Sequence, residues 1–232
     1  MELEQRLLSL IWQDRTDDAF DLLLEHPRAD LSHPGGHSLI LEALDRGHAV
    51  FAAILADQTP ALQTGEAAAI GDVERLGQLL ADEPARRNDP DRRGRSPLYL
   101  ASRHGRPEAA RLLLDWGADP HQESTDARHD TPLHAACRGR HPELTAQLLE
   151  AGVEPVGRDG HGYTPVHEAA ASGDADSLHL LLAAGAEAEP PSRDGESPLQ
   201  LAQRAGHRDA AEVLRQAAKP VPAILVAPLL AH

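Results

Sequence analysis

Four side chains that could bind a metal ion lie close together in the sequence. His129, His134, Cys137 and His141 fall within 13 residues, and imidazole and thiolate groups are the ligands that zinc prefers. Their spacing matches no standard zinc finger, however, and free cysteine is among the most buried residue types. We therefore interpret these residues as structural, and we predict neither a metal site nor any other cofactor.

Other catalytic signatures are absent from the sequence. It contains no Gly-x-x-x-x-Gly-Lys phosphate-binding loop and no Gly-x-Ser-x-Gly elbow. No set of residues suggests a nucleophile, a base and an orienting group that act together. We predict that the protein is not an enzyme. The enzymatic alternative requires an activity that disappears when His134, Cys137 or His141 is replaced.

One of these histidines belongs to a tetrapeptide that recurs along the chain. Successive copies are 35, 33 and 33 residues apart, and self-similarity at a fixed period of this size indicates stacked repeats rather than one closed core. The four copies are Ser96-Pro97-Leu98-Tyr99, Thr131-Pro132-Leu133-His134, Thr164-Pro165-Val166-His167 and Ser197-Pro198-Leu199-Gln200.

The tetrapeptide predicts the start of a helix. The hydroxyl of Ser or Thr caps a free backbone N–H of the first turn, which contributes about 1 kcal/mol, and proline suits the first helical position because its missing N–H would have no partner there. A second helix follows in each unit. It begins near Glu108, Glu143, Asp176 or Asp209, where an acid favours the helix dipole. Each unit is therefore a helix, a turn, a second helix and a loop.

These units resemble the ankyrin repeat. Gly162-Tyr163-Thr164-Pro165-Val166-His167 and Leu112-Leu113-Leu114-Asp115-Trp116-Gly117-Ala118-Asp119 match its pattern closely. The resemblance implies that His134 and His167 are hydrogen-bonded within or between repeats. It also implies a hairpin finger before each Thr-Pro.

The expected fold is an all-α solenoid of about seven stacked helix-turn-helix repeats with short hairpin fingers. We predict that residues 1–64 hold two degenerate capping repeats, with helices over 6–12, 19–24, 38–44 and 50–55 and a turn at 33–36. The alternative for this region is a separate small helical domain. Residues 65–218 form the ankyrin repeats, and two extra residues within 121–130 lengthen one finger.

Residues 219–232 are predicted to form an irregular tail. Pro220, Pro222 and Pro228 interrupt any helix, whereas the sequence Ala223-Ile224-Leu225-Val226 is apolar enough to favour burial. The tail either frays or folds back over the last repeat. Alternatively, it pairs in extended form with another chain.

Composition favours a cytoplasmic protein. Cys137 is the single cysteine and cannot form a disulfide within the chain, the N-terminus lacks the features of a signal peptide, and no apolar stretch is long enough to span a membrane. Lys219 is the single lysine, beside much alanine, glycine and proline. This composition is typical of a GC-rich, bacterial coding sequence.

The resemblance places partner binding on the concave side of the solenoid. The positions that face a partner are those of the hairpin fingers and the outward positions of the first helix in each repeat. Carried over position by position, this surface is rich in arginine. Its predicted partner-binding residues are Arg92, Arg93, Arg95, Arg103, His104, Arg128, Asp130, Arg138, His161 and Tyr163.

We interpret the chain as a module that binds another protein, one with an acidic surface, and inhibits or sequesters it. The net charge is −15, and the acids concentrate in residues 1–90, with 17 acids against 7 arginines, compared with 20 acids against 15 basic residues in 91–232. This acidity disfavours nucleic acid as a partner, and we expect a monomer or a heterocomplex. The alternatives are a bacterial immunity protein that neutralises a toxin and an effector that acts on host proteins.

A structural interpretation of the arginines also remains open, because charged loops are often simply solvated. If the concave arginines bind the partner, replacing Arg95 and Arg128 with Glu weakens partner capture by well over tenfold and leaves the melting temperature unchanged. Neutralising Asp17, Asp18 and Asp21 tests whether the acidic half covers a basic cleft.

Overall fold

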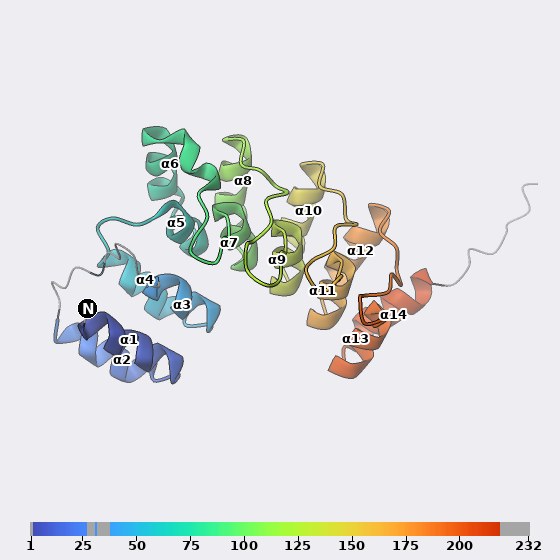
Figure 1. Ribbon diagram of the computed structural model, residues 1–232, viewed down its shortest axis with the longest axis horizontal. Helices are drawn as coiled ribbons and strands as arrows, with labels where there is room; N and C mark the ends of the chain where they lie inside the picture. The colour runs from blue at the N-terminus through green and yellow to red at the C-terminus, as the bar shows by residue number, and fades with distance from the viewer. Residues whose placement is uncertain (1, 27–30, 32–37, 219–232) are drawn as a thin grey trace, which may run out of the picture.

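The computed structural model describes residues 2–26, 31 and 38–218 and shows a row of stacked helices (Figure 1). In these residues there are fourteen α-helices and one short 3₁₀ helix, and no β-strand. Consecutive α-helices form seven pairs. The prediction of an all-α solenoid of about seven repeats is therefore confirmed.

The first helices of the pairs have seven or eight residues from α3 onward, and α5, α9 and α11 carry two or three alanines each. Small side chains allow neighbouring helices to approach closely. These helices are α1 (Glu2–Trp12), α3 (Leu39–Asp45), α5 (Thr64–Ile70), α7 (Pro97–Arg103), α9 (Pro132–Gly139), α11 (Pro165–Ser172) and α13 (Pro198–Ala205).

From α6 onward, the second helices form a row beside the first ones (Figure 1). They bury Leu and Ala on the side that faces the neighbouring helices. These helices are α2 (Thr16–Leu24), α4 (Ala49–Asp57), α6 (Val73–Asp82), α8 (Pro107–Asp115), α10 (Pro142–Glu150), α12 (Ala175–Ala183) and α14 (Arg208–Ala217), and the 3₁₀ helix η1 (Pro84–Asn88) follows α6.

Side-chain caps begin the first helices as the sequence predicts. The Ser96 hydroxyl accepts a hydrogen bond from the backbone N–H of Tyr99 at 3.1 Å. In the next repeat the backbone N–H of Thr131 donates to His134 Nδ1 at 3.4 Å. The other ring nitrogen, Nε2, lies 3.1 Å from the carbonyl oxygen of Tyr163 in the following repeat. The predicted structural role of this histidine is therefore confirmed.

Hairpin fingers precede α7, α9, α11 and α13. In the finger 91–95 the backbone N–H of the first residue donates to the carbonyl of the last, and the fingers 159–163 and 192–196 have the same form. The finger before α9 is longer, because its closing hydrogen bond joins Ser124 and Asp130. The two extra residues therefore lengthen this finger, as expected.

The four N-terminal helices, α1 to α4, pack together as one unit, which we call the N-terminal module (residues 2–57). Its apolar cluster extends beyond the module to Tyr99, Leu100 and Ala135 of α7 and α9. In Figure 1 the module lies below the row of α5, α7 and α9. It therefore packs against the side of the solenoid on which the first helices lie.

Some predicted features fall outside the described residues, namely the turn at 33–36 and the tail 219–232. The predicted helical hairpins of residues 6–24 and 38–55 are present, with slightly longer helices. The boundary after residue 64 stays a prediction, since α5 begins at Thr64. Within the described part of the chain, no helix has the length and apolar character that a membrane span requires.

Candidate protein-binding surface

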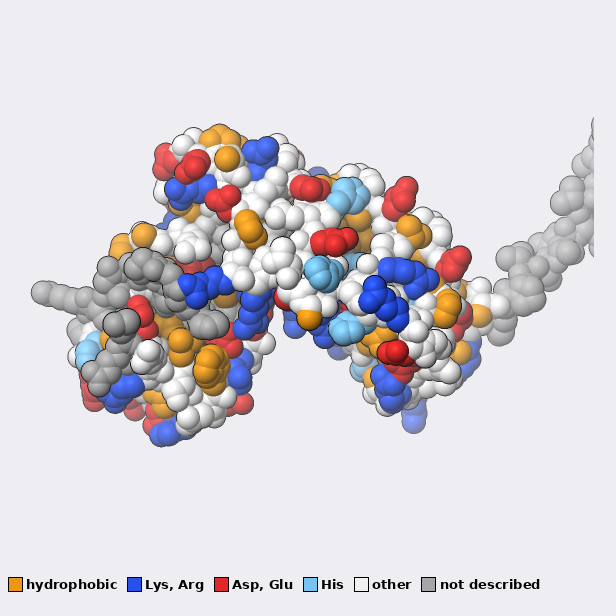
Figure 2. Space-filling view, viewed as in Figure 1, with side chains coloured by type: hydrophobic (Ala, Val, Ile, Leu, Met, Phe, Trp, Pro, Cys, Tyr) orange, Lys and Arg blue, Asp and Glu red, His pale blue; other side chains and the backbone are white. Residues whose placement is uncertain are grey.

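The ten residues predicted to bind a partner lie on three consecutive fingers and at α7 and α9. We call this set, from Arg92 to Tyr163, the arginine surface. Figure 2 shows a hollow between the N-terminal module and the later repeats, with arginine side chains at its edge. The fold thus brings the predicted residues to one side of the molecule, where several interact with carboxylates of the same chain.

Arg95 is the centre of the first of these interactions. Its guanidinium lies 2.8 Å from Asp45 of α3 and 2.7 Å from Asp91 of its own finger, and only 7% of its side chain is exposed. Arg93 lies 3.1 Å from Glu42 and 3.3 Å from Asp45. These arginines therefore connect the N-terminal module to the fourth repeat.

Asp45 stays ionised although it is largely buried. Burial raises the pKa of this carboxyl, but the adjacent His104 ring and the charge of Arg95 outweigh burial and lower the pKa to about 2. The His104 ring lies 3.4 Å from Asp45. For Arg95, burial lowers the pKa, and the charges of Asp45 and Asp91 more than reverse this effect. The cluster is thus a buried ion pair with a persistent charge on each side.

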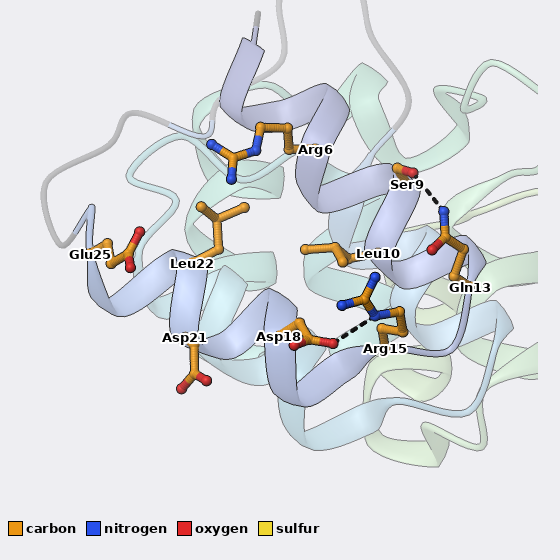
Figure 3. Close-up of a pocket in the computed structure, with 9 residues that line it drawn as sticks. All are labelled: Arg6, Ser9, Leu10, Gln13, Arg15, Asp18, Asp21, Leu22 and Glu25. Atoms are coloured by element: carbon orange, nitrogen blue, oxygen red, sulfur yellow. Dashed lines mark hydrogen bonds and ion pairs between the residues drawn. The ribbon is translucent and has the colours of Figure 1, made fainter.

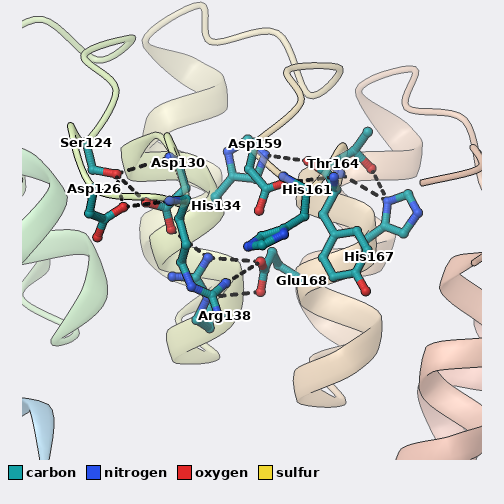
Figure 4. A network of polar contacts seen from close by, with 12 residues as sticks. Ser124, Asp126, Asp130, His134, Arg138, Asp159, His161, Thr164, His167 and Glu168 are labelled. Carbon is teal, nitrogen blue, oxygen red and sulfur yellow. Dashed lines mark hydrogen bonds and ion pairs between the residues drawn. The ribbon is translucent and has the colours of Figure 1, made fainter. Parts of the chain in front are cut away.

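Arg138 is the centre of a second cluster, drawn in Figure 4. It lies 2.6 Å from Asp130 and 2.9 Å from Glu168 of the next repeat, and its Nη1 also donates to the Tyr99 hydroxyl at 3.3 Å. Asp130 is fully buried and accepts a further hydrogen bond from Ser124 at 2.8 Å. This cluster therefore joins three successive repeats through side chains.

The charges of the second cluster shift the pKa values of Asp130 and Tyr99. Burial raises the pKa of Asp130, but the neighbouring guanidinium of Arg138 outweighs burial, and the net shift is downward. Burial and the nearby Asp130 carboxylate raise the pKa of Tyr99 to about 12. Tyr99 is therefore a neutral hydrogen-bond donor to a charged acceptor at physiological pH.

The remaining predicted residues are more accessible. Arg92 is exposed and Arg103 is half-buried, and neither has a charged partner among the described residues. Arg128 keeps 46% of its side chain exposed while lying 3.5 Å from Glu168. His161 is exposed, and its ring centroid lies 6.3 Å from that of Tyr163. These side chains form the part of the arginine surface that a partner can reach.

Tyr163 has a mixed role. Its ring stacks on His167 with centroids 5.1 Å apart, and its hydroxyl donates to Glu196 at 2.9 Å. The ring nitrogen Nε2 of His167 lies 3.2 Å from the carbonyl oxygen of Glu196. Tyr163 is therefore only half-buried but already oriented by its own repeat and by the next one.

The four potential metal ligands from the sequence do not converge. His129 is exposed, whereas His134 and Cys137 are buried in the repeat. The Cys137 sulfur lies 3.7 Å from the Thr145 hydroxyl, and burial raises the pKa of its thiol. In the described part of the chain, no group of three or more His, Cys, Asp and Glu side chains is arranged to hold a metal ion.

A pocket at the N-terminal end of the stack is lined mainly by polar groups (Figure 3). It has a volume of about 440 Å³ and lies between α1 and α2. Arg15 donates to Asp18 at 2.7 Å across its rim. Polar side chains are expected at this end, because no further repeat covers it in the described chain.

Comparison with known proteins agrees with this architecture. A family model described as ankyrin repeats (3 copies) matches residues 8–124, 119–192 and 157–222.

The chain belongs to the ankyrin-repeat family.

Two mammalian proteins are similar in sequence to part of this ankyrin-repeat chain. It is 38% identical over 100 residues to the DNA-binding protein RFXANK of Homo sapiens, a match that covers 41% of this chain and 38% of the relative. It is 62% identical over 34 residues to the DNA-binding protein RFXANK of Mus musculus, which covers 15% of this chain and 13% of that relative. The chain thus spans well under half the length of either relative.

Ankyrin repeats are protein-interaction modules. The sequence reasoning missed five residues that contact the predicted arginines, namely Glu42, Asp45, Asp91, Tyr99 and Glu168. A signal for Asp45 was present. The sequence around Gly47 aligns with that around Gly105 at an offset of 58, and this alignment places Asp45 at the position of Arg103.

The predicted effect of replacing Arg95 needs correction. Because its side chain is buried in an ion pair with Asp45 and Asp91, an acidic replacement at this position would bury like charges. The melting temperature would then fall, contrary to the expectation from sequence. A test of partner binding has to use arginines that are accessible and unpaired.

Proposed function

We propose that this ankyrin-repeat chain binds an acidic segment of another protein through its arginine surface. One observation carries the proposal: the same surface already binds the carboxylates Glu42 and Asp45 of α3, at 3.1 Å and 2.8 Å. Arginine presents a planar group that matches carboxylate geometry and is enriched at protein interfaces.

Accessible arginines lie beside the ion pairs that Glu42 and Asp45 form. Arg93 and Arg128 each keep 46% of the side chain exposed, although both already contact a carboxylate. Arg92 and Arg103 have no charged partner among the described residues. A partner's carboxylates can therefore extend the existing clusters without first breaking the buried pair of Arg95 and Asp45.

The proposed consequence of binding is inhibition or sequestration, because a rigid stack of repeats can cover a partner's working surface. A dedicated bacterial inhibitor that neutralises a toxin is one version of this proposal. An effector that acts on host proteins is another. The proposed location is the cytoplasm, because a single cysteine, Cys137, fits a reducing compartment.

The experiment starts with affinity capture of the partner from the source organism's lysate and then measures binding of the purified partner. We expect the double variant Arg92→Glu/Arg103→Glu to weaken binding by more than tenfold. Its melting temperature should be unchanged, because neither arginine pairs with a described charge. The matched control is Arg6→Glu/Arg208→Glu, which makes the same charge change at exposed positions away from this surface.

Equal weakening by both double variants would mean that only net charge matters, and the proposal would fail. Nucleic acid is a second outcome to examine, because both relatives are named as DNA-binding proteins. The net charge of −15 opposes phosphate contacts. If the purified chain shifts duplex DNA in an electrophoretic assay at physiological salt, and the Arg92/Arg103 variant does not, the proposed protein partner is replaced by DNA.

A further inference from the structure

Helix α4 departs from a rule that the other second helices of the repeats follow. The second residue of each of these helices is acidic, and at this position in the first turn an acid interacts favourably with the positive end of the helix dipole. In α4 this position holds Val50, and 78% of its surface is exposed. The acidic residues at the equivalent position are Asp17, Glu74, Glu108, Glu143, Asp176 and Asp209.

Val50 lines an apolar groove between α2 and α4. The other apolar side chains of its lining include Phe20 of α2, which is 38% exposed, and Phe51 and Ile54 of α4. The groove has a volume of about 430 Å³. We call it the α2–α4 groove.

The apolar surface continues along α2 beyond the groove. Leu24 lies one turn after Phe20, on the same face of the helix, and is 60% exposed. Single exposed apolar residues are common, but a contiguous exposed apolar patch is typical of an interaction site. Here the patch also replaces a dipole-stabilising acid, so local helix stability does not explain it.

The charge around the groove is negative. Asp17 lies in its lining and has no charged partner among the described residues. Asp14 lies 3.3 Å from the lining residue His48 and 3.5 Å from Arg46, so this nearby arginine is already paired. Residues 1–90 as a whole carry 17 acids against 7 arginines. A basic ligand is therefore favoured over an acidic one.

We propose that the α2–α4 groove is a second docking site, which binds a basic helical segment of a partner protein through one bulky apolar side chain. That side chain enters between Phe20 and Val50. Flanking Lys or Arg residues of the partner face Asp17 and the acidic surface of α2. The site is separate from the arginine surface, and it requires a partner segment of the opposite charge.

The test uses a defined probe, a synthetic 14-residue helical peptide with leucine at every third or fourth position and lysine elsewhere. Titrated into the ¹⁵N-labelled full chain, it should shift the amide signals of α2 and α4 selectively. Val50→Glu restores the acid that the other second helices carry, so the fold should be retained or stabilised. This variant should weaken peptide binding by at least tenfold.

The matched control is Val156→Glu, which places the same charge at another exposed valine, 53% exposed and far along the chain. It should leave peptide binding within twofold of the unmodified chain. A companion peptide with glutamate in place of lysine should bind at least tenfold more weakly. Equal binding of the two peptides would overturn the charge argument and, with it, the proposal.

Two further outcomes would also overturn it. One is the absence of selective shifts in α2 and α4 at millimolar peptide. The other is a concentration-dependent dimer of the chain, seen by sedimentation, that Val50→Glu dissociates, because the occupant would then be a second copy of this chain. Retained partner binding at the arginine surface in the Val50→Glu variant would show that the two sites are independent.

Discussion

The N-terminal module and the later repeats are held in the stack by different kinds of interaction. Between later repeats, a histidine of one first helix reaches a carbonyl of the next finger, as in the contact between His134 and Tyr163, 29 residues apart. The described residues of the module form no such finger. It is joined to the fourth repeat by ion pairs such as Asp45 with Arg95, 50 residues apart.

This difference shows that a surface usually associated with partners can also serve the chain's own architecture. Repeats with a finger need only their neighbours, since each finger brings its own backbone and side-chain contacts. The module instead places two carboxylates on a finger that lies two repeats away. Its attachment therefore combines apolar packing against α7 and α9 with ion pairs to a distant finger, whereas the later repeats form their polar contacts with the repeat next to them.

The largest expected effect is that of breaking the buried ion pair. Arg95→Ala removes one partner and leaves Asp45 and Asp91 without their main counter-charge, which costs about 3–5 kcal/mol for a buried pair. We expect the amides of α1 to α4 to lose protection from hydrogen exchange before those of α9 to α12. Urea denaturation and hydrogen exchange measure the two effects.

The control for this prediction is Arg15→Ala. Its partner Asp18 is half exposed, as is Arg15 itself, and exposed pairs contribute only about 0–1 kcal/mol. If Arg95→Ala costs no more than Arg15→Ala, the module does not depend on the buried pair.

A smaller effect distinguishes the interior of the stack from its end. Gly173 and Gly206 occupy equivalent positions after α11 and α13, with positive φ angles of 76° and 78°. A Cβ at Gly173 would lie 2.6 Å from the ring of His207, whereas a Cβ at Gly206 meets nothing within 4 Å. We expect Gly206→Ala to cost about 1–2 kcal/mol from backbone strain.

Gly173→Ala should cost about 1–3 kcal/mol more than Gly206→Ala, because the following repeat has to move as well. Thermal or urea unfolding of the two variants measures the difference. If both variants lose the same free energy of unfolding, the last two repeats can move apart at Gly173 without loss of stability. Gly173 would then lie in a looser interface than its short distances to His207 indicate.

The smallest effect concerns pH. Burial lowers the pKa of His134 and of His167 below the ordinary value of 6.5, and their hydrogen bonds to backbone carbonyls offset this only in part. Below pH 6.5 the folded chain therefore binds fewer protons than the unfolded chain. The contribution of these histidines to stability is therefore fully present above pH 6.5 and decreases as the pH falls below this value.

His134→Gln tests this prediction with a residue that the chain itself uses. Gln200 occupies the equivalent position in the last repeat, and its side-chain oxygen accepts from the Ser197 backbone N–H at 2.9 Å. The variant should keep the cap and show a weaker pH dependence between about pH 7 and 5. The free energy of unfolding is measured by urea titration at each pH. If it changes with pH as strongly in the variant as in the unmodified chain, His134 is not the titrating group.

Asp45 and Asp130 affect stability only at lower pH, below the ordinary pKa of 3.8, because their pKa values are lowered.

Much of the fold could be predicted because its signals are local. The Ser-Pro at 96–97 fixes a helix start through one hydroxyl and one ring, and the recurrence of this signal after 35, 33 and 33 residues places the later starts without knowledge of distant contacts. The helices of the module were also predicted, although their packing against α7 and α9 was not. That packing brings together residues from separate parts of the chain.

The arginine surface could be predicted only as a set of positions. The repeat register places Arg95 and Arg92 on the same finger and gives no reason to separate them, yet one is buried in an ion pair and the other is exposed. What separates them is the location of α3, whose Asp45 reaches one guanidinium and not the other.

The sequence by itself therefore determined the repeat period, the helix starts and the arginine-rich fingers, because caps, prolines and turns act over a few residues. The tertiary structure decided which of those arginines are paired within the chain and which remain accessible to a partner. That decision depends on where the N-terminal module packs, since a buried ion pair between residues 50 positions apart forms only when the solenoid brings α3 to the finger of the fourth repeat.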